Sequence, residues 1–162
     1  MANYSIGKCT FNDQQWKDVD LKSREEFKLF LSSFSKFSNI GESSGNCSWD
    51  ISCLTENNIS VVFELKDRNY TSDRFGDIMV EFDKYTNNKK YCPNYKIIAV
   101  NFYRDGVFAF CEMNDETMNV SFKNCPRTTM LAGCRKDKVV KKTVTLPQMY
   151  KFKKINNKWR KI

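Results

Sequence analysis

Apolar side chains recur at helical spacing near the start of the chain. Across residues 23–37 they fall on one stripe: Phe27, Phe30, Leu31 and Phe34. This spacing predicts an amphipathic helix that packs an aromatic face on a core. Ser23 followed by Glu26 matches a capping box and predicts that the helix begins there. Residues 39–48, rich in Gly, Ser and Asn, are typical of a loop.

Two pairs of strand-like stretches follow the first helix. Residues 49–55 and 59–68 are dominated by β-branched and other apolar side chains, and the turn Glu-Asn-Asn separates them. Residues 95–103 and 107–113 have the same layout around Arg-Asp-Gly. Each pair is predicted to form a hairpin.

A second amphipathic helix is predicted between these hairpins, over residues 73–88. Its apolar stripe consists of Phe75, Ile78, Met79 and Phe82. After the second hairpin, residues 119–123 and 140–147 favour strands, residues 124–137 favour a loop, and the end of the chain shows no regular alternation.

The order of elements is helix, strand, strand, helix, strand, strand and then mixed β structure. It favours an α/β (α+β) fold with a mixed central β-sheet flanked by helices, and not a doubly wound nucleotide-binding fold. The sequence contains no Gly-rich phosphate-binding motif. With 162 residues and 19.1 kDa, the chain is expected to be one domain.

The residues that are missing exclude several kinds of chemistry. There is no histidine, which removes Ser-His-Asp triads, Cys-His dyads and His-dependent zinc sites. The seven cysteines are spread out with no C-x-x-C pair, so buried thiols in a reducing compartment are expected. Neither a signal peptide nor a membrane-spanning stretch is evident, and the protein is expected to be soluble and cytoplasmic.

Positive charge gathers at the C-terminal end. The net charge is +8, and the segment from Arg135 to Ile162 carries eleven Lys or Arg against one Asp. The rest of the chain is therefore slightly acidic. A basic segment of this kind favours a polyanionic partner, of which nucleic acid is the commonest, although it also fits a solvated tail.

Two charges interrupt the apolar stretch 59–68. Glu64 and Lys66 are two residues apart, so in a strand both project from the same face. Val61, Phe63 and Leu65 occupy the other face, and Val62 precedes the two charges, which suggests a strand covered on both sides. Buried charges require partners. The alternative is an edge strand with its charges in solvent.

A carboxylate on the preceding strand adds a third group. The predicted turn folds Asp50 back toward Glu64, with Lys66 on the same side as Glu64. Two carboxylates on adjacent strands with a nearby lysine suit phosphodiester hydrolysis without histidine, because the acids can hold Mg²⁺ and the lysine can orient water.

These residues resemble a known superfamily. Asp50, a spacer of thirteen residues and then Glu64-Leu65-Lys66 are similar to the D-x(n)-(D/E)-x-K signature of the PD-(D/E)xK, or restriction endonuclease-like, nucleases. Trp49 stands where that signature often has proline. The resemblance covers roughly residues 23–113.

The resemblance implies Mg²⁺- or Mn²⁺-dependent cleavage of nucleic acid, usually DNA, by one nuclease-like domain spanning residues 1–162, with a basic segment from about residue 135. Asp50 and Glu64 would be metal ligands, with the Leu65 carbonyl as a third, and Lys66 would position the attacking water. Superfamily members of this size often form homodimers. A catalytically inactive nucleic-acid-binding module on the same fold is the alternative, and a structural domain is a third.

Further residues are assigned roles around this site. Glu26 is the candidate for the acid that many superfamily members place on the first helix, although a capping role also explains it. The nucleic-acid-binding candidates are Arg68, Lys84, Lys141 and Lys142.

Overall fold

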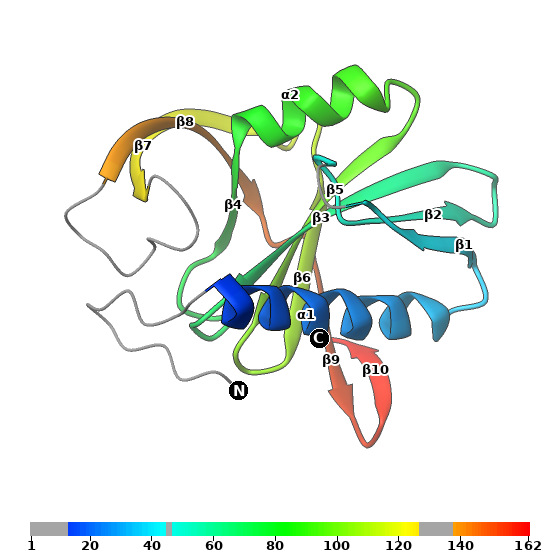
Figure 1. Ribbon diagram of the computed structural model, residues 1–162. Helices are drawn as coiled ribbons and strands as arrows, with labels where there is room; N and C mark the ends of the chain where they lie inside the picture. Colours follow the sequence, from blue (N-terminus) through cyan, green and yellow to red (C-terminus); the bar gives the residue numbers. More distant parts are fainter. Residues whose placement is uncertain (1–12, 45–46, 127–137) are drawn as a thin grey trace.

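The protein folds into two β-sheets and two helices (Figure 1). A computed structural model describes residues 13–44, 47–126 and 138–162. The helices in these ranges are α1 (Asp13–Ser32) and α2 (Phe82–Tyr91). The strands are β1 (Phe37–Glu42), β2 (Ile51–Thr55), β3 (Ser60–Arg68), β4 (Asp77–Glu81), β5 (Lys96–Tyr103), β6 (Val107–Glu112), β7 (Asn119–Pro126), β8 (Lys138–Pro147), β9 (Tyr150–Ile155) and β10 (Lys158–Lys161).

The larger sheet has seven strands in the order β1-β2-β3-β5-β6-β9-β10, and the smaller has the order β4-β8-β7. In the larger sheet β3 and β5 are parallel, and the other neighbours are antiparallel. The connection between β3 and β5 contains β4 and α2, which is the kind of crossover that parallel neighbours require. The predicted mixed sheet flanked by helices is confirmed.

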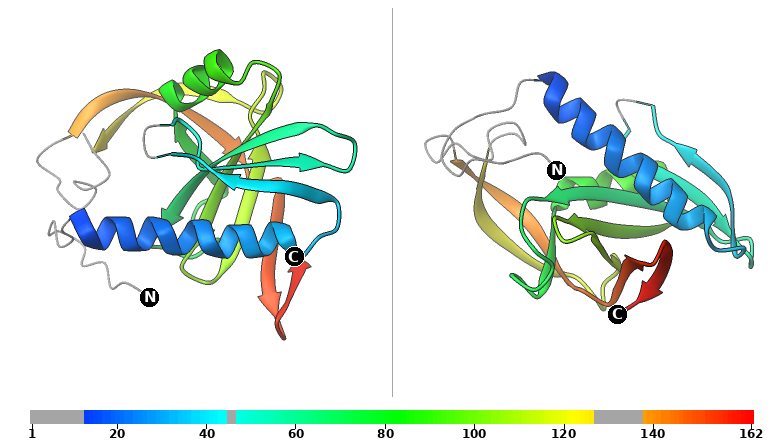
Figure 2. Two further views of the ribbon diagram at one scale, coloured as in Figure 1. Left: turned by 45° about the vertical axis from the view of Figure 1, so that its right-hand side comes forward. Right: turned by 90° about the horizontal axis from the view of Figure 1, so that it is seen from below.

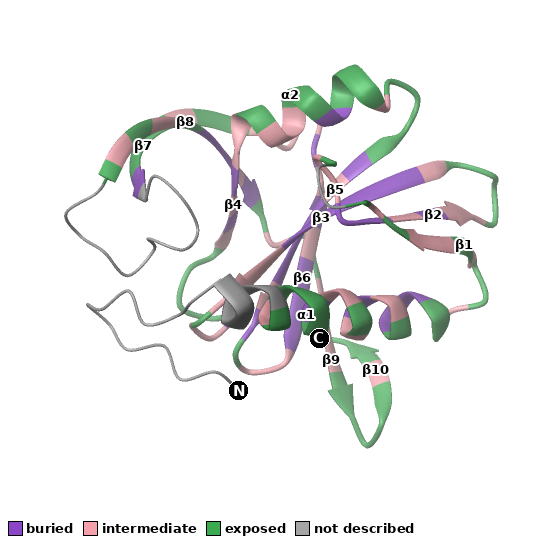
Figure 3. Cartoon of the chain, viewed as in Figure 1, coloured by how far each residue is buried: buried purple, intermediate pink, exposed green. Residues whose placement is uncertain are grey.

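Both faces of the larger sheet are covered (Figure 2). On one face α1 packs its aromatic stripe against Phe63 and Phe108. On the other face β4 and β8 pack against Val62 and its neighbours. Consecutive residues of β3 from Val61 to Leu65 are therefore buried, as the purple colour of this strand in Figure 3 shows. The prediction of a strand covered on both sides is confirmed.

The predicted helix over residues 73–88 is wrong in its first half. Asp77–Glu81 forms β4, and only Phe82–Tyr91 is helical. In β4 the buried residues Ile78 and Val80 alternate with partly exposed ones, which is a strand period. The strand is stabilised by antiparallel pairing with β8, a segment more than fifty residues away, which local periodicity does not report.

The boundaries of the first helix also differ from the prediction. The helix begins at Asp13 and ends at Ser32, so Ser23 lies in its interior and is not an N-cap. The hydroxyl oxygen of Ser23 instead lies 3.2 Å from the carbonyl oxygen of Val19, one turn earlier in the helix, while its proton is donated to the Asp67 carboxylate of β3. Because Ser23 does not cap the helix, a capping box does not explain Glu26.

Two segments predicted without regular structure contain strands. Part of residues 39–48 belongs to β1, and the C-terminal end forms the hairpin β9–β10. The predicted loop 124–137 begins within β7, and its residues 127–137 lie outside the described ranges, as do residues 135–137 of the basic segment. Neither helix in the described ranges combines the length and apolar character needed to cross a membrane.

Candidate active site

The hairpin of β2 and β3 brings Asp50 beside Glu64. β2 pairs antiparallel with β3 from Ile51 opposite Phe63, and Asp50 continues the pairing as its N–H donates to the Phe63 carbonyl at 2.8 Å. The Asp50 carboxylate oxygen Oδ2 accepts from the N–H of Leu65 at 2.7 Å. Asp50 is thus hydrogen-bonded to Phe63 and Leu65, the residues immediately before and after Glu64.

Glu64 is buried with an incomplete set of partners. Its side chain is 2% exposed, and oxygen Oε1 lies 3.3 Å from Lys84 Nζ and 3.7 Å from Lys66 Nζ. The other oxygen, Oε2, is buried and has no hydrogen-bond partner within the described residues. A buried carboxylate oxygen without a donor costs free energy. A ligand that binds this oxygen would therefore remove that cost.

The same surroundings change the ionisation of Glu64. Burial, followed by the negative charge of Asp50, raises the pKa of Glu64 to about 7, while Lys66 and Lys84 act in the opposite direction. The negative charge of Asp50 therefore opposes the ionisation of Glu64. A carboxylate that titrates near neutral pH, beside a second acid and two lysines, has the electrostatics of a functional site.

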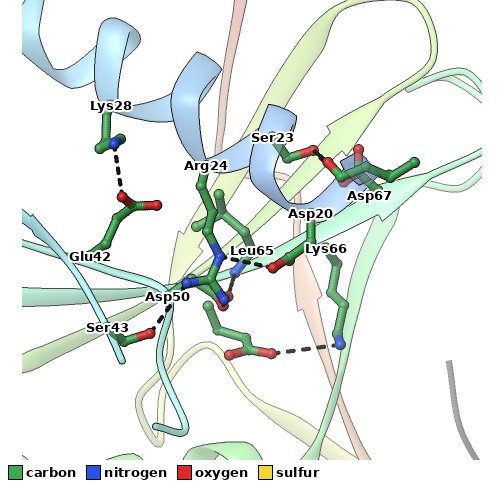
Figure 4. A network of polar contacts seen from close by, with 12 residues as sticks. Asp20, Ser23, Arg24, Lys28, Glu42, Ser43, Asp50, Leu65, Lys66 and Asp67 are labelled. Carbon is green, nitrogen blue, oxygen red and sulfur yellow. Dashed lines mark hydrogen bonds and ion pairs between the residues drawn. The ribbon is translucent and has the colours of Figure 1, made fainter. Parts of the chain in front are cut away.

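Asp50 is held from two sides. Arg24 of α1 lies between Asp20 and Asp50, and its Nη2 donates to Asp50 Oδ1 at 2.7 Å (Figure 4). Asp20 Oδ2 lies 3.0 Å from Arg24 Nε, one helical turn away. Burial raises the pKa of Asp50, whereas the Leu65 N–H and Arg24 lower it. Both carboxylate oxygens of Asp50 therefore have protein donors.

Glu26 lies elsewhere. It lines a pocket of about 400 Å³ together with Ser23, Asp67 and Arg68, close to the turn between β5 and β6. Asp67 accepts a hydrogen bond from Ser23 in this pocket, and burial raises its pKa to about 6. The ion pairs that connect α1 to the Asp50 carboxylate are formed by Arg24 with Asp50 and by Asp20 with Arg24, and among the described residues no ion pair joins Glu26 to them.

The four predicted nucleic-acid contacts have different surroundings. Lys84 belongs to the Glu64 cluster, through its Nζ atom. Arg68 is tied to β4, because its Nη2 donates to the Met79 carbonyl at 2.6 Å. Lys141 Nζ lies 2.7 Å from Glu81 Oε1, and Lys142 Nζ lies 3.9 Å from the centre of the Phe82 ring. These last two lysines lie on β8 of the smaller sheet.

Sequence reasoning missed Arg24 and the contact between Lys84 and Glu64. The spacing of Asp20 and Arg24 on a helix was a visible sign of an ion pair, but it does not indicate that Arg24 also reaches a different strand. Lys84 lies in the first turn of α2, which begins at Phe82 directly after β4, and from there its Nζ atom contacts Glu64. That boundary differs from the sequence prediction.

The residues of the cluster fit a hard divalent cation in part. No group of three or more His, Cys, Asp or Glu side chains arranged for a metal exists within the described residues. The oxygen donors that the structure brings to this cluster are the Asp50 and Glu64 carboxylates, and Mg²⁺ is commonly held by one or two carboxylates with water and substrate oxygens. The partnerless Oε2 atom of Glu64 is the observation that favours such a cation.

Comparisons with known proteins give a likeness to solved structures alone. No family model matches the chain, and no curated protein matches it. Among solved structures, a match is Hjc, a Holliday junction resolvase from the archaeal hyperthermophile Archaeoglobus fulgidus. The identity is 10% and the TM-score 0.47, over 76% of this chain and 86% of the resolvase. The chemistry assigned to the chain therefore rests on its own residues.

Proposed function

We propose that the chain is a metal-dependent nuclease that hydrolyses phosphodiester bonds of DNA, built as one nuclease-like domain over residues 1–162. The observation that carries the proposal is the Glu64 carboxylate, which is buried beside Asp50 with two lysines on one oxygen and no hydrogen-bond partner on the other within the described residues. An arrangement so costly to folding is typical of a site retained for function.

In this proposal Asp50 and Glu64, together with the Leu65 carbonyl, hold Mg²⁺ or Mn²⁺. When bound, the cation supplies positive charge at the phosphate and favours ionisation of water. Arg24 and the Leu65 N–H hold the Asp50 carboxylate in one orientation, so it needs no rearrangement during the reaction.

The two lysines supply the remaining positive charge. Lys66 and Lys84 approach the same oxygen of Glu64 from β3 and α2, and both keep part of their side chains in solvent. Lys66 orients the attacking water, and Lys84 contacts the phosphate. Water attacks phosphorus in line with the leaving 3′ oxygen, so the products carry a 5′-phosphate and a 3′-hydroxyl.

One observation favours the second candidate, a nucleic-acid-binding module without activity. Both oxygens of Asp50 accept hydrogen bonds from protein donors. This is expected of a carboxylate that stabilises the fold, because one bond holds Arg24 of α1 and the other joins the start of β2 to β3. In that case the lysines on Glu64 would only offset its buried charge.

Cleavage assays separate the two candidates. The protein is incubated with supercoiled plasmid and with four-way junction DNA in Mg²⁺ or Mn²⁺, beside the Glu64→Gln and Lys66→Met variants. Lys96 and Glu112 form an exposed ion pair at 3.0 Å, so Glu112→Gln and Lys96→Met are matched controls with the same chemical changes. We expect at least a ~100-fold loss of rate in the site variants, since removing one group that stabilises the transition state has an effect of this size, and none in the controls.

The other outcomes are equally informative. Salt-sensitive binding of DNA without cleavage by the wild-type protein supports the inactive module. Cleavage at wild-type rate by the Glu64→Gln variant contradicts the proposed active site, and absence of both cleavage and binding contradicts the nucleic-acid assignment.

A further inference from the structure

The smaller sheet extends beyond the body of the protein as a two-stranded ribbon. β4 pairs with β8 only as far as Glu81 opposite Thr143. Beyond that pair, residues 138–142 of β8 pair with residues 122–126 of β7 alone. Figure 1 shows this end of the smaller sheet at the left, reaching away from the seven-stranded sheet. These two stretches are called the ribbon below.

One face of the ribbon is exposed and mixes apolar with polar side chains. Phe122 lies opposite Lys142, and Asn124 lies opposite Val140, so these four side chains share a face. All four are exposed, Phe122 by 72% and Val140 by 67%. Within the described residues Phe122 makes no contact with another ring and Asn124 makes no side-chain hydrogen bond. Large apolar side chains this exposed suggest a surface that binds a partner.

The charge of the ribbon has a single sign. Four lysines lie on its two strands, and no Asp or Glu does: Lys123, Lys138, Lys141 and Lys142. Lys141 is paired with Glu81, whereas Lys142 forms no ion pair with the residues that the structure describes and lies over the Phe82 ring, an interaction of about 0.5–1 kcal/mol at an exposed site. A phosphate or a base edge can therefore compete for Lys142.

We propose that the ribbon enters the major groove of duplex DNA and positions the duplex on the protein. A two-stranded β-ribbon fits that groove, where Asn and Lys side chains bind base edges and apolar side chains contact the thymine methyl group. Asn124, Lys142, Phe122 and Val140 together supply this chemistry on one face. Lys138 lies on the same face and would contact a flanking phosphate, whereas Lys123 lies on the opposite face and donates to Thr145. This inference rests on the proposed nucleic-acid substrate.

Other occupants fit the ribbon less well. A second copy of the chain docked ribbon to ribbon would bring the lysines of both copies together, and the like charges would repel. Double-stranded RNA has a deep and narrow major groove that side chains do not read. Charge and shape together favour DNA.

The test measures binding in EDTA, so that cleavage does not interfere. The probe is a fluorescein-labelled DNA duplex of 25 base pairs, compared with an RNA duplex of the same length. The ribbon variant is Lys138→Glu/Lys142→Glu. The matched control is Lys154→Glu/Lys158→Glu in the hairpin β9–β10, which changes the net charge equally at exposed positions. A third variant, Phe122→Ser, removes the exposed ring, and thermal unfolding checks that each variant is folded.

We expect the ribbon variant to bind DNA at least ~10-fold more weakly than the control, with a salt slope lower by about two because two phosphate or base contacts are lost. Wild-type protein should protect guanine N7 atoms in the major groove from methylation, and Phe122→Ser should weaken DNA binding several-fold without changing stability. Binding of the RNA duplex should be weaker than that of DNA.

Three results would overturn the proposal. They are equal losses in the ribbon and control variants, protection confined to the minor groove, and a fall in oligomeric state in Phe122→Ser without a loss of DNA affinity. If the wild-type protein cleaves DNA while the ribbon variant binds and cleaves as well as wild type, the ribbon assignment fails and the nuclease stands. If the wild-type protein binds no DNA, both fail.

Discussion

Arg24 of α1 donates to the Oδ1 atom of Asp50 at 2.7 Å and thereby connects the first helix to the end of β2. Asp50 uses its other oxygen to accept from the Leu65 N–H. The carboxylate next to Glu64 is thus fixed by a helix on one side and by a strand on the other. A group held in this way serves both stability and the proposed catalysis.

Replacing Arg24 by methionine should destabilise the protein. The change leaves the mostly buried Asp50 carboxylate without its cationic partner, which we expect to lower the free energy of unfolding by about 3–5 kcal/mol. Urea unfolding at pH 7 measures this. Asp50→Asn in the Arg24→Met background should recover part of the loss, because the uncompensated charge is gone. Asp20→Asn should have a smaller effect, since Asp20 is 54% exposed. If Arg24→Met has the same free energy of unfolding as wild type, the Arg24–Asp50 pair does not stabilise the fold.

Glu64→Gln should stabilise the protein at alkaline pH. The pKa of Glu64 is raised to about 7, so the folded state keeps a proton that the unfolded chain loses near its ordinary pKa of 4.5. This residue therefore reduces stability progressively as pH rises from about 4.5 to 7 and by a constant amount above that. Glutamine removes the effect, and we expect a gain of about 1–3 kcal/mol at pH 8 and much less at pH 4.5.

Chemical unfolding of both proteins at the two pH values measures this difference. Glu112→Gln is the control, because Glu112 pairs with Lys96 at the surface and should show no comparable dependence on pH. A gain in Glu64→Gln that is equal at pH 4.5 and pH 8 would contradict the raised pKa.

Divalent cations should stabilise the wild-type protein by binding the carboxylates of Asp50 and Glu64. A ligand that binds only the folded state at ten times its dissociation constant adds about 1.4 kcal/mol. We therefore expect the midpoint of thermal unfolding to rise with added Mn²⁺ or Mg²⁺ at pH 8, and Asp50→Asn and Glu64→Gln to abolish the rise. NaCl at matched ionic strength is the control, because Na⁺ reproduces the screening without the divalent charge. A rise of the same size in the Glu64→Gln variant would place the cation elsewhere.

Trp159 should stabilise the C-terminal hairpin and not contact nucleic acid. Its ring packs edge-on against Phe30 at 5.2 Å between centres, and it lies 5.0 Å from Phe108. Trp159→Ala should therefore lower the free energy of unfolding by about 2–4 kcal/mol, in the range of large aromatic truncations. The DNA affinity of Trp159→Ala, measured at a temperature at which the variant is fully folded, should match that of wild type. Tyr150→Ala, an exposed position on β9, serves as control.

Much of the fold followed from local patterns. The aromatic stripe of α1, the hairpin β2–β3 and the hairpin β5–β6 rest on residues close in sequence, so periodicity and turn residues were enough to predict them. The placement of Asp50 beside Glu64 follows from the same hairpin. Its role in catalysis stays a prediction.

Contacts between distant segments decided the rest. β4 is a strand because it pairs with β8, a remote partner that overrides the helical spacing of its apolar residues. Because β4 is a strand, α2 begins at Phe82, and Lys84 in its first turn contacts Glu64. The packing of α1 on the sheet brings Arg24, and not Glu26, to Asp50. The sequence alone determined which charges interrupt a buried strand. Only tertiary packing decided which charges meet them, because ion pairs depend on distances that sequence separation does not specify.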